Sequence, residues 1–196
     1  MIEKWGCYTQ PEPVWKGIPG FFDFQDVYNE IADWAQDGFT LVEVGSFLGR
    51  SACYLGEQLQ ARGKRVTLIC VDTWPAAYNW GPEHFPQLVI ESPFETFYAN
   101  VRQSGLLGTI VPIRASSARA SDFIKDGLDF VYIDAGHDYP NIANDISVWL
   151  PKVRSGGILA GHDYNLESFP GVVQAVNESF GPDQREIRGA SWVVKL

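Results

Sequence analysis

The chain has 196 residues, a net charge of −9, and a composition that is 45% hydrophobic and 20% charged. These values are typical of a globular protein, and we expect one domain over residues 1–196. The acidic balance argues against nucleic acid and against an anionic membrane surface as partners, because phosphate groups bind to basic faces. Three scattered cysteines, no signal-like N-terminal run and no apolar stretch of membrane length favour a cytoplasmic protein.

The predicted elements alternate along the chain. An N-terminal extension, 1–38, is rich in proline, glycine and aromatic residues and ends in a helix at about 25–36. The core, 39–196, has predicted strands at 40–44, 65–71, 109–113, 129–133 and 158–159, helices at 51–59, 94–103, 117–125, 139–150 and 172–180, and a closing hairpin of 185–188 and 191–196. This order predicts an α/β fold of the Rossmann-like, doubly wound type. Its sheet would be mostly parallel and seven-stranded, with an antiparallel C-terminal hairpin strand.

The segment 73–93 has no clear period and holds four prolines, two tryptophans and His84. A loop of this length inside a compact domain is usually functional or mobile. Two interpretations stay open: an aromatic lid over an acceptor molecule, or a surface insertion that packs on the N-terminal extension. That extension carries no cofactor motif, so we expect it to contribute to the acceptor pocket or to a subunit contact of a homo-oligomer.

The pentapeptide Ala-Gly-His-Asp-Tyr occurs twice, at 135–139 and 160–164, and each copy follows a short apolar run. Two of the three histidines of the chain, His137 and His162, lie in these copies. Ligands of parallel α/β sheets bind beyond the carboxyl ends of the strands, so these residues are candidates for a reaction centre. Structural roles stay open beside the functional ones: loop orientation for Asp134, pairing of His137 with Asp138, a buried and hydrogen-bonded position that shapes the pocket for His162, and capping of the following segment by Asp163.

A second pattern, Glu43-x-Gly45-x-x-x-Gly49, follows the first predicted strand and precedes a helix. It lacks the third glycine of the dinucleotide-binding fingerprint. Glycines here permit a sharp turn and a close approach of a ligand to the backbone. Asp72, at the tip of the second strand, is placed to accept hydrogen bonds from ribose hydroxyls. Together these features favour a nucleoside ligand.

On these segments, 42–51, 71–74, 128–139 and 156–164, the chain resembles the class I S-adenosylmethionine-dependent methyltransferases. Within that class it resembles the small-molecule O-methyltransferases that include metal-dependent enzymes acting on antibiotic sugars. The resemblance implies S-adenosyl-L-methionine as cofactor, with the 43–51 loop near its methionine part, Asp72 at the ribose and the Ser116–Ser117 turn near the adenine. The cofactor-binding candidates are Glu43, Gly45, Ser46, Gly49, Ser51, Asp72, Thr73, Trp74, Ser116, Ser117 and Asp134.

The resemblance also implies a reaction, the methylation of a hydroxyl group of a small-molecule acceptor. Its catalytic candidates are His137, as general base, and Asp134, and its metal ligands are Asp134, His162 and Asp163. The first residue of the pair 162–163 is an acid in the related enzymes and a histidine here. Magnesium prefers oxygen ligands, whereas imidazole suits zinc, iron or manganese better, so the identity of the metal stays open. A set of two carboxylates and one histidine would suit Mn²⁺ or Fe²⁺ as well as Mg²⁺. The rival interpretations are a dinucleotide-dependent oxidoreductase, a hydroxylase-like enzyme and a non-catalytic binding protein.

Overall fold

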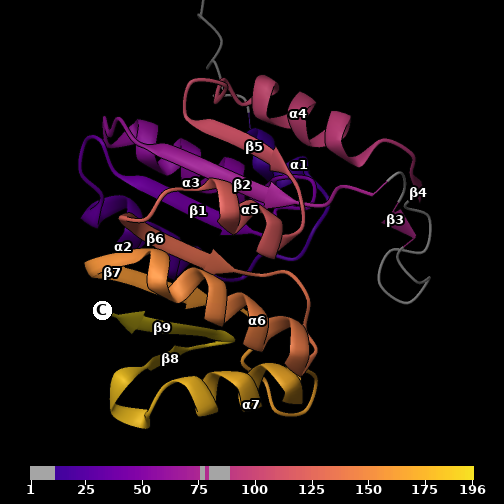
Figure 1. Cartoon of the computed structure of the whole chain (residues 1–196). Coiled ribbons are helices and arrows are strands. Elements are labelled where there is room, and N and C mark those ends of the chain that lie inside the picture. The colour runs from indigo at the N-terminus through magenta and orange to yellow at the C-terminus, as the bar shows by residue number, and fades with distance from the viewer. Residues whose placement is uncertain (1–11, 76–77, 80–88) are drawn as a thin grey trace, which may run out of the picture.

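A computed structural model describes residues 12–75, 78–79 and 89–196. It contains one seven-stranded sheet whose strands lie in the order β5-β2-β1-β6-β7-β9-β8 (Figure 1). The strands are β1 (Thr40–Val44), β2 (Thr67–Asp72), β5 (Ile110–Arg114), β6 (Leu128–Ile133), β7 (Val153–Gly161), β8 (Glu186–Arg188) and β9 (Ser191–Lys195). Neighbours from β5 to β7 pair in parallel, and β9 pairs antiparallel with both β7 and β8. The predicted fold class is therefore confirmed.

Helices cover both faces of the sheet. They are α1 (Val14–Gly17), α2 (Gln25–Trp34), α3 (Arg50–Ala61), α4 (Pro93–Gln103), α5 (Ser117–Phe123), α6 (Tyr139–Trp149) and α7 (Pro170–Ser179), with short 3-10 turns η1 (Leu150–Lys152) and η2 (Pro182–Gln184). Alternate residues of a strand point to opposite faces. On β6, Phe130 and Tyr132 pack into the layer of α1–α4, and Val131 and Ile133 pack into the layer of α5–α7. Burial on both sides explains why this strand reads as a continuous apolar run.

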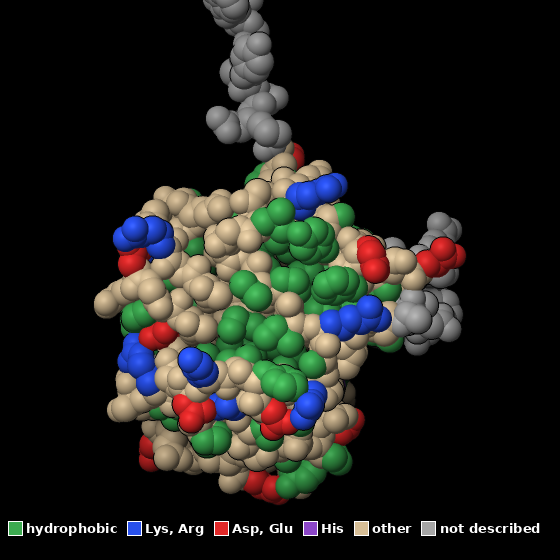
Figure 2. All heavy atoms as spheres, turned by 45° about the horizontal axis from the view of Figure 1, so that its top comes forward, with side chains coloured by type: hydrophobic (Ala, Val, Ile, Leu, Met, Phe, Trp, Pro, Cys, Tyr) green, Lys and Arg blue, Asp and Glu red, His purple; other side chains and the backbone are tan. Residues whose placement is uncertain are grey.

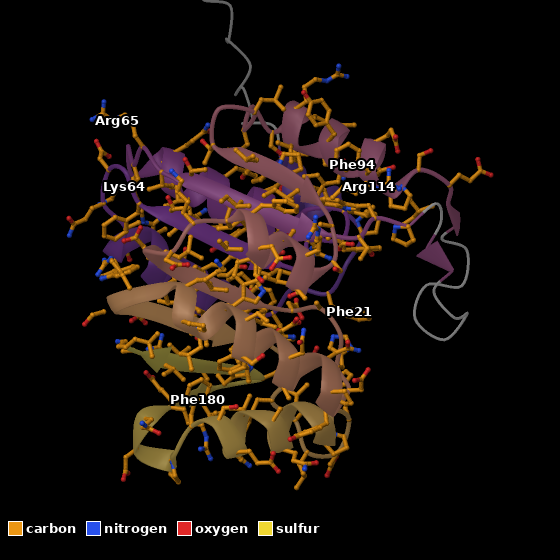
Figure 3. All side chains as sticks on the ribbon, viewed as in Figure 1. Phe21, Lys64, Arg65, Phe94, Arg114 and Phe180 are labelled. Atoms are coloured by element: carbon orange, nitrogen blue, oxygen red, sulfur yellow. The ribbon has the colours of Figure 1, made fainter. Side chains whose placement is uncertain are left out.

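The carboxyl ends of the five parallel strands meet at one edge of the sheet. Figure 3 shows Phe21, Phe94 and Arg114 at this edge, and Lys64 and Arg65 at the opposite end. The loops that leave β1, β2, β5, β6 and β7 therefore surround a common region. In an open α/β sheet this is the region in which ligands bind.

The 73–93 segment contains a small antiparallel pair, β3 (Tyr78–Asn79) and β4 (Val89–Ile90). The predicted lid aromatics Trp80 and Phe85, together with His84, lie outside the described residues, so both interpretations of this segment stay predictions. Among the described residues, no helix combines the length and the apolar character that crossing a membrane requires.

Strand β5 is an edge of the sheet, and apolar side chains are exposed around it. Figure 2 shows hydrophobic side chains gathered on the face that carries α4, α5 and β5. Tyr98, Val111 and Phe123 of these elements are 44%, 46% and 64% exposed. Exposed apolar surface of this kind is compatible with a subunit contact. The expected homo-oligomer stays a prediction.

Candidate active site

An open cavity of about 1160 Å³ lies at the carboxyl edge of the sheet. The loop after β1, the ends of β2, β6 and β7, the start of α5 and the N-terminal residues 20–23 line it. Most of the predicted site residues lie in its wall: Gly45, Ser46, Ser51, Asp72, Thr73, Ser116, Ser117, Asp134, His137, His162 and Asp163. Segments that are far apart in the sequence thus contribute to one cavity.

The turn after β1 is shaped by Gly45, whose φ of +96° is in the left-handed region. A Cβ atom at this position would lie 1.9 Å from the backbone oxygen of Asp134, so only glycine lets the ends of β1 and β6 approach this closely. The carboxylate of Asp72 accepts backbone hydrogen bonds from Phe47 (2.8 Å) and Trp74 (2.9 Å), which ties this turn to the one after β2. A carboxylate is an acceptor of the kind that a ribose hydroxyl can donate to.

Three predicted cofactor residues are not in the cavity wall: Glu43, Gly49 and Trp74. Glu43 is buried beneath the loop, where the hydroxyl of Tyr28 donates a 2.6 Å hydrogen bond to it and burial raises the pKa of its carboxyl group. Gly49 precedes α3 with a φ of +87°. The indole of Trp74 is fully buried and donates a 2.5 Å hydrogen bond to the backbone oxygen of Phe47. These residues support the loop from behind, and in this structure Trp74 has no face with which to stack on a nucleoside in the cavity.

The cavity wall at the start of α5 contains Asp145, a residue that the sequence analysis missed. It lies on α6 and is only 4% exposed, and burial raises the pKa of its carboxyl group to about 6. Nearby, Ser116 caps α5, and the hydroxyl of Ser117 accepts a 2.8 Å hydrogen bond from the indole of Trp149. The sequence pattern that could have identified Asp145 is its position as a lone acid on the otherwise apolar face of an amphipathic helix.

The two copies of the pentapeptide lie side by side because β6 and β7 are neighbours, with Ile133 level with Gly161. Asp134 and His162 are therefore level with each other just beyond the strand ends. The Nε2 atom of His137 is 2.8 Å from Asp163 Oδ2, and Nδ1 of His162 is 3.2 Å from Asp163 Oδ1. Possible ligand atoms of Asp134, His162 and Asp163 all lie within 4.8 Å of one another.

Corresponding residues have different roles in the two copies of the pentapeptide. In the first copy, Asp138 caps α6 and binds the backbone of Asn141, so it does not pair with His137. In the second copy, Asp163 has a φ of +60° and interacts with both histidines. An aspartate in the left-handed region at a functional site is a common form of local strain. Tertiary position, and not the motif, decides which aspartate faces the cavity.

The charges of this cluster are strongly coupled. Burial raises the pKa of Asp134 to about 7, and Asp163 adds to the rise against the opposing effect of His162. Burial also works against ionisation of Asp163, but hydrogen bonds from His137 and His162 outweigh it and lower the pKa. The pKa of His162 rises to about 9, because the hydrogen bond with Asp163 and the nearby carboxylates overcome the effect of burial. A positive charge, a proton or a metal ion, is therefore favoured among these carboxylates.

The N-terminal segment supplies one more group that the sequence analysis missed. Asp23 Oδ1 lies 2.7 Å from Nε2 of His162, although 139 residues separate the two in the chain. No local pattern around Asp23 signals this contact.

Comparison with known proteins agrees with this geometry. Residues 42–164 match a family model described as "Methyltransferase domain". An uncharacterized protein of Acanthamoeba polyphaga mimivirus is 26% identical over 160 residues, which are 79% of this chain and 65% of that protein. The chain thus spans less than two thirds of the length of that curated relative.

Solved structures share the fold at low sequence identity. The O-methyltransferase NovP has a TM-score of 0.65 and 18% identity, and the match covers 87% of this chain and 78% of NovP. A calicheamicin methyltransferase has a TM-score of 0.57 and 16% identity, with coverages of 87% and 76%. Precorrin 8w decarboxylase of Methanobacterium thermoautotrophicum has a TM-score of 0.59 and 16% identity, with coverages of 92% and 94%. The reactions in these names differ, so the shared fold does not identify the acceptor.

Proposed function

Because the chain belongs to the methyltransferase domain family, we propose that it transfers a methyl group from S-adenosyl-L-methionine to a hydroxyl group of a small molecule. The observation that carries this proposal is that the turns after β1 and β2 and the cluster around His137 and Asp134 line the same cavity. Its volume of about 1160 Å³ exceeds the usual ~300–1,000 Å³ of a small-ligand pocket, which leaves room for a cofactor and a small acceptor together.

The charge of the cavity suits this cofactor. Its wall carries five carboxyl groups, against one arginine and two histidines. S-adenosylmethionine is a sulfonium cation, and carboxylates around it favour the positive charge. Asp72 would hold the ribose hydroxyls, and Ser116, Ser117 and Asp145 offer polar groups to the adenine.

Asp134, His162 and Asp163 would hold a divalent metal ion. Two carboxylates and one imidazole within 4.8 Å of one another form a donor set that suits Mn²⁺ or Fe²⁺, and also Mg²⁺. The raised pKa of Asp134, caused first by burial, supports the assignment, because a bound cation would relieve this unfavourable charge. When bound, such an ion lowers the pKa of a hydroxyl group coordinated to it.

His137 would act as the general base. Its Nε2 atom lies 2.8 Å from Asp163, one of the proposed metal ligands. An acceptor hydroxyl bound beside these ligands would therefore lie close to the imidazole. The hydrogen bond with Asp163 raises the pKa of His137, and the imidazole takes up a proton more readily as a result. The ring of Phe169 packs against His137, with 4.8 Å between the ring centroids, and limits the movement of the imidazole.

The proposal is tested in two steps. Calorimetry with S-adenosylhomocysteine should show binding, and NAD should give no heat, which separates a methyltransferase from a dinucleotide-dependent enzyme. A panel of hydroxylated acceptors is then screened by mass spectrometry, where methylation adds 14 mass units and hydroxylation adds 16.

The role of His137 as the general base is tested by substitution. His137→Ala should lower turnover by about 10²–10⁴-fold with unchanged binding of S-adenosylhomocysteine. Unchanged turnover would show that His137 is not the base.

A further inference from the structure

Asp23 reaches the cluster because the segment around it is firmly anchored. Phe22 and Phe24, on either side of it, are 9% and 3% exposed. The guanidinium of Arg50 donates a 2.6 Å hydrogen bond to the backbone oxygen of Gly20, three residues earlier. The segment 20–24 is therefore held across the carboxyl edge of the sheet, with the Asp23 carboxylate at the cavity wall.

The imidazole of His162 is held on two sides by this segment. Its ring lies 4.9 Å from the ring of Phe24, which in turn stacks on Tyr132 at 4.6 Å. Its Nε2 atom is 2.7 Å from Asp23 Oδ1. The carboxylate oxygen accepts the hydrogen bond of this pair, so the imidazole N–H lies on Nε2.

The other nitrogen of the ring is directed at the candidate metal ligands. Nδ1 of His162 lies 3.2 Å from Asp163 Oδ1 and 3.8 Å from Asp134 Oδ1. Because the imidazole is rigid, holding Nε2 from the outside fixes the direction of Nδ1 on the inside. A hydrogen bond from the outer N–H of a metal-binding histidine to a carboxylate sets its tautomer and makes it a stronger ligand.

We propose that Asp23 is a positioning residue, which orients His162 so that Nδ1 completes a metal site with Asp134 and Asp163. The inference rests on the metal site of the proposed function. It makes the N-terminal segment a part of that site, so docking of this segment and binding of the metal ion strengthen each other. Asp23 would touch neither the metal ion nor the reacting atoms.

The test is a calorimetric titration of the full chain with Mn²⁺. Asp23→Ala should weaken binding about tenfold, at the low end of the ~10–100-fold range for such partners, because the Asp23 side chain is 71% exposed. Asp23→Asn, which keeps an acceptor oxygen, should lie between wild type and Asp23→Ala. The matched control is Asp33→Ala, which removes another ion-paired carboxylate, one that is 70% exposed, and it should leave the affinity unchanged.

Two further measurements separate positioning from a general effect of charge. Pulsed electron paramagnetic resonance of bound Mn²⁺ should show nitrogen coupling from His162 in the wild type, which weakens in Asp23→Ala and is absent in His162→Ala. In a His162→Asp background, residue 162 has no N–H to donate, and the Asp23 carboxylate repels its neighbour. There, Asp23→Ala should leave Mn²⁺ affinity unchanged or improve it, whereas a purely electrostatic role predicts weaker binding.

The outcomes are distinct. Unchanged Mn²⁺ affinity and unchanged nitrogen coupling in Asp23→Ala would overturn this inference and leave the proposed function intact. Failure of the wild type to bind Mn²⁺ would overturn both the metal site and this inference. The proposed methyltransferase activity would still be tested separately, by binding of S-adenosylhomocysteine and by the mass of the product.

Discussion

Asp145→Asn should stabilise the protein at neutral pH, although it removes a charged group from the cavity wall. Asp145 is 4% exposed, and burial raises the pKa of its carboxyl group from 3.8 to about 6, with a smaller opposing effect of Ser117. The native state therefore binds the proton more tightly than the unfolded chain does. The stabilisation that comes from the protonated form is complete below the unfolded pKa and is lost as the pH rises through the folded pKa.

The size of the expected stabilisation follows from the shift in the pKa of Asp145. One pKa unit corresponds to about 1.4 kcal/mol, so a rise of about 2 units destabilises the ionised protein by at most ~3 kcal/mol above pH 6. Asparagine keeps the shape and an acceptor oxygen for Ser117, and it carries no charge at any pH. For a domain of this size, ~2 kcal/mol corresponds to a rise in melting temperature of about 4–8 °C.

The assay is thermal and urea unfolding of wild type and Asp145→Asn at pH 4 and pH 8, without cofactor, so that ligand binding does not contribute. The variant should be more stable at pH 8, and the difference should vanish toward pH 4. Asp122→Asn, at a position that is 61% exposed on α5, is the control and should show no such dependence. A stability difference that is the same at both pH values, or a less stable variant at pH 8, would refute the reasoning.

Two further predictions concern the support of the cofactor loop. Gly45→Ala places a Cβ atom 1.9 Å from the backbone oxygen of Asp134, so denaturant unfolding should show a loss of at least ~3 kcal/mol and calorimetry should show loss of S-adenosylhomocysteine binding. Gly63→Ala, at a φ of +68° in open space, should lose only about 1–2 kcal/mol; equal losses in the two variants would exclude the clash as the cause. Tyr28→Phe removes the 2.6 Å hydrogen bond to buried Glu43 and should destabilise the protein by ~1.5–3 kcal/mol in urea unfolding. Adding Glu43→Gln to Tyr28→Phe should recover part of that loss, and a double variant less stable than Tyr28→Phe alone would contradict this account.

Local patterns in the sequence predicted the elements and the edge of the sheet at which the site lies. The apolar run 130–133 and the alternation around it reflect burial of a central strand on both faces, which is a property of neighbouring residues. Because parallel strands end at a common edge, residues directly after strands, such as Asp72, Asp134 and His162, were expected to share one cavity, and they line it. Hydrophobic periodicity carries this information without any knowledge of long-range contacts.

Only the tertiary structure decided what the individual side chains touch. Glu43 and Trp74 lie in motifs near the predicted cofactor, yet burial against Tyr28 and Phe97 places both behind the cavity wall. The identical pentapeptides direct Asp138 to a helix end and Asp163 to two histidines, because the first copy leads into α6 and the second follows the neighbouring strand β7. Asp23 meets His162 through packing of Phe22 and Phe24 into the core, a contact between distant segments that no periodicity encodes.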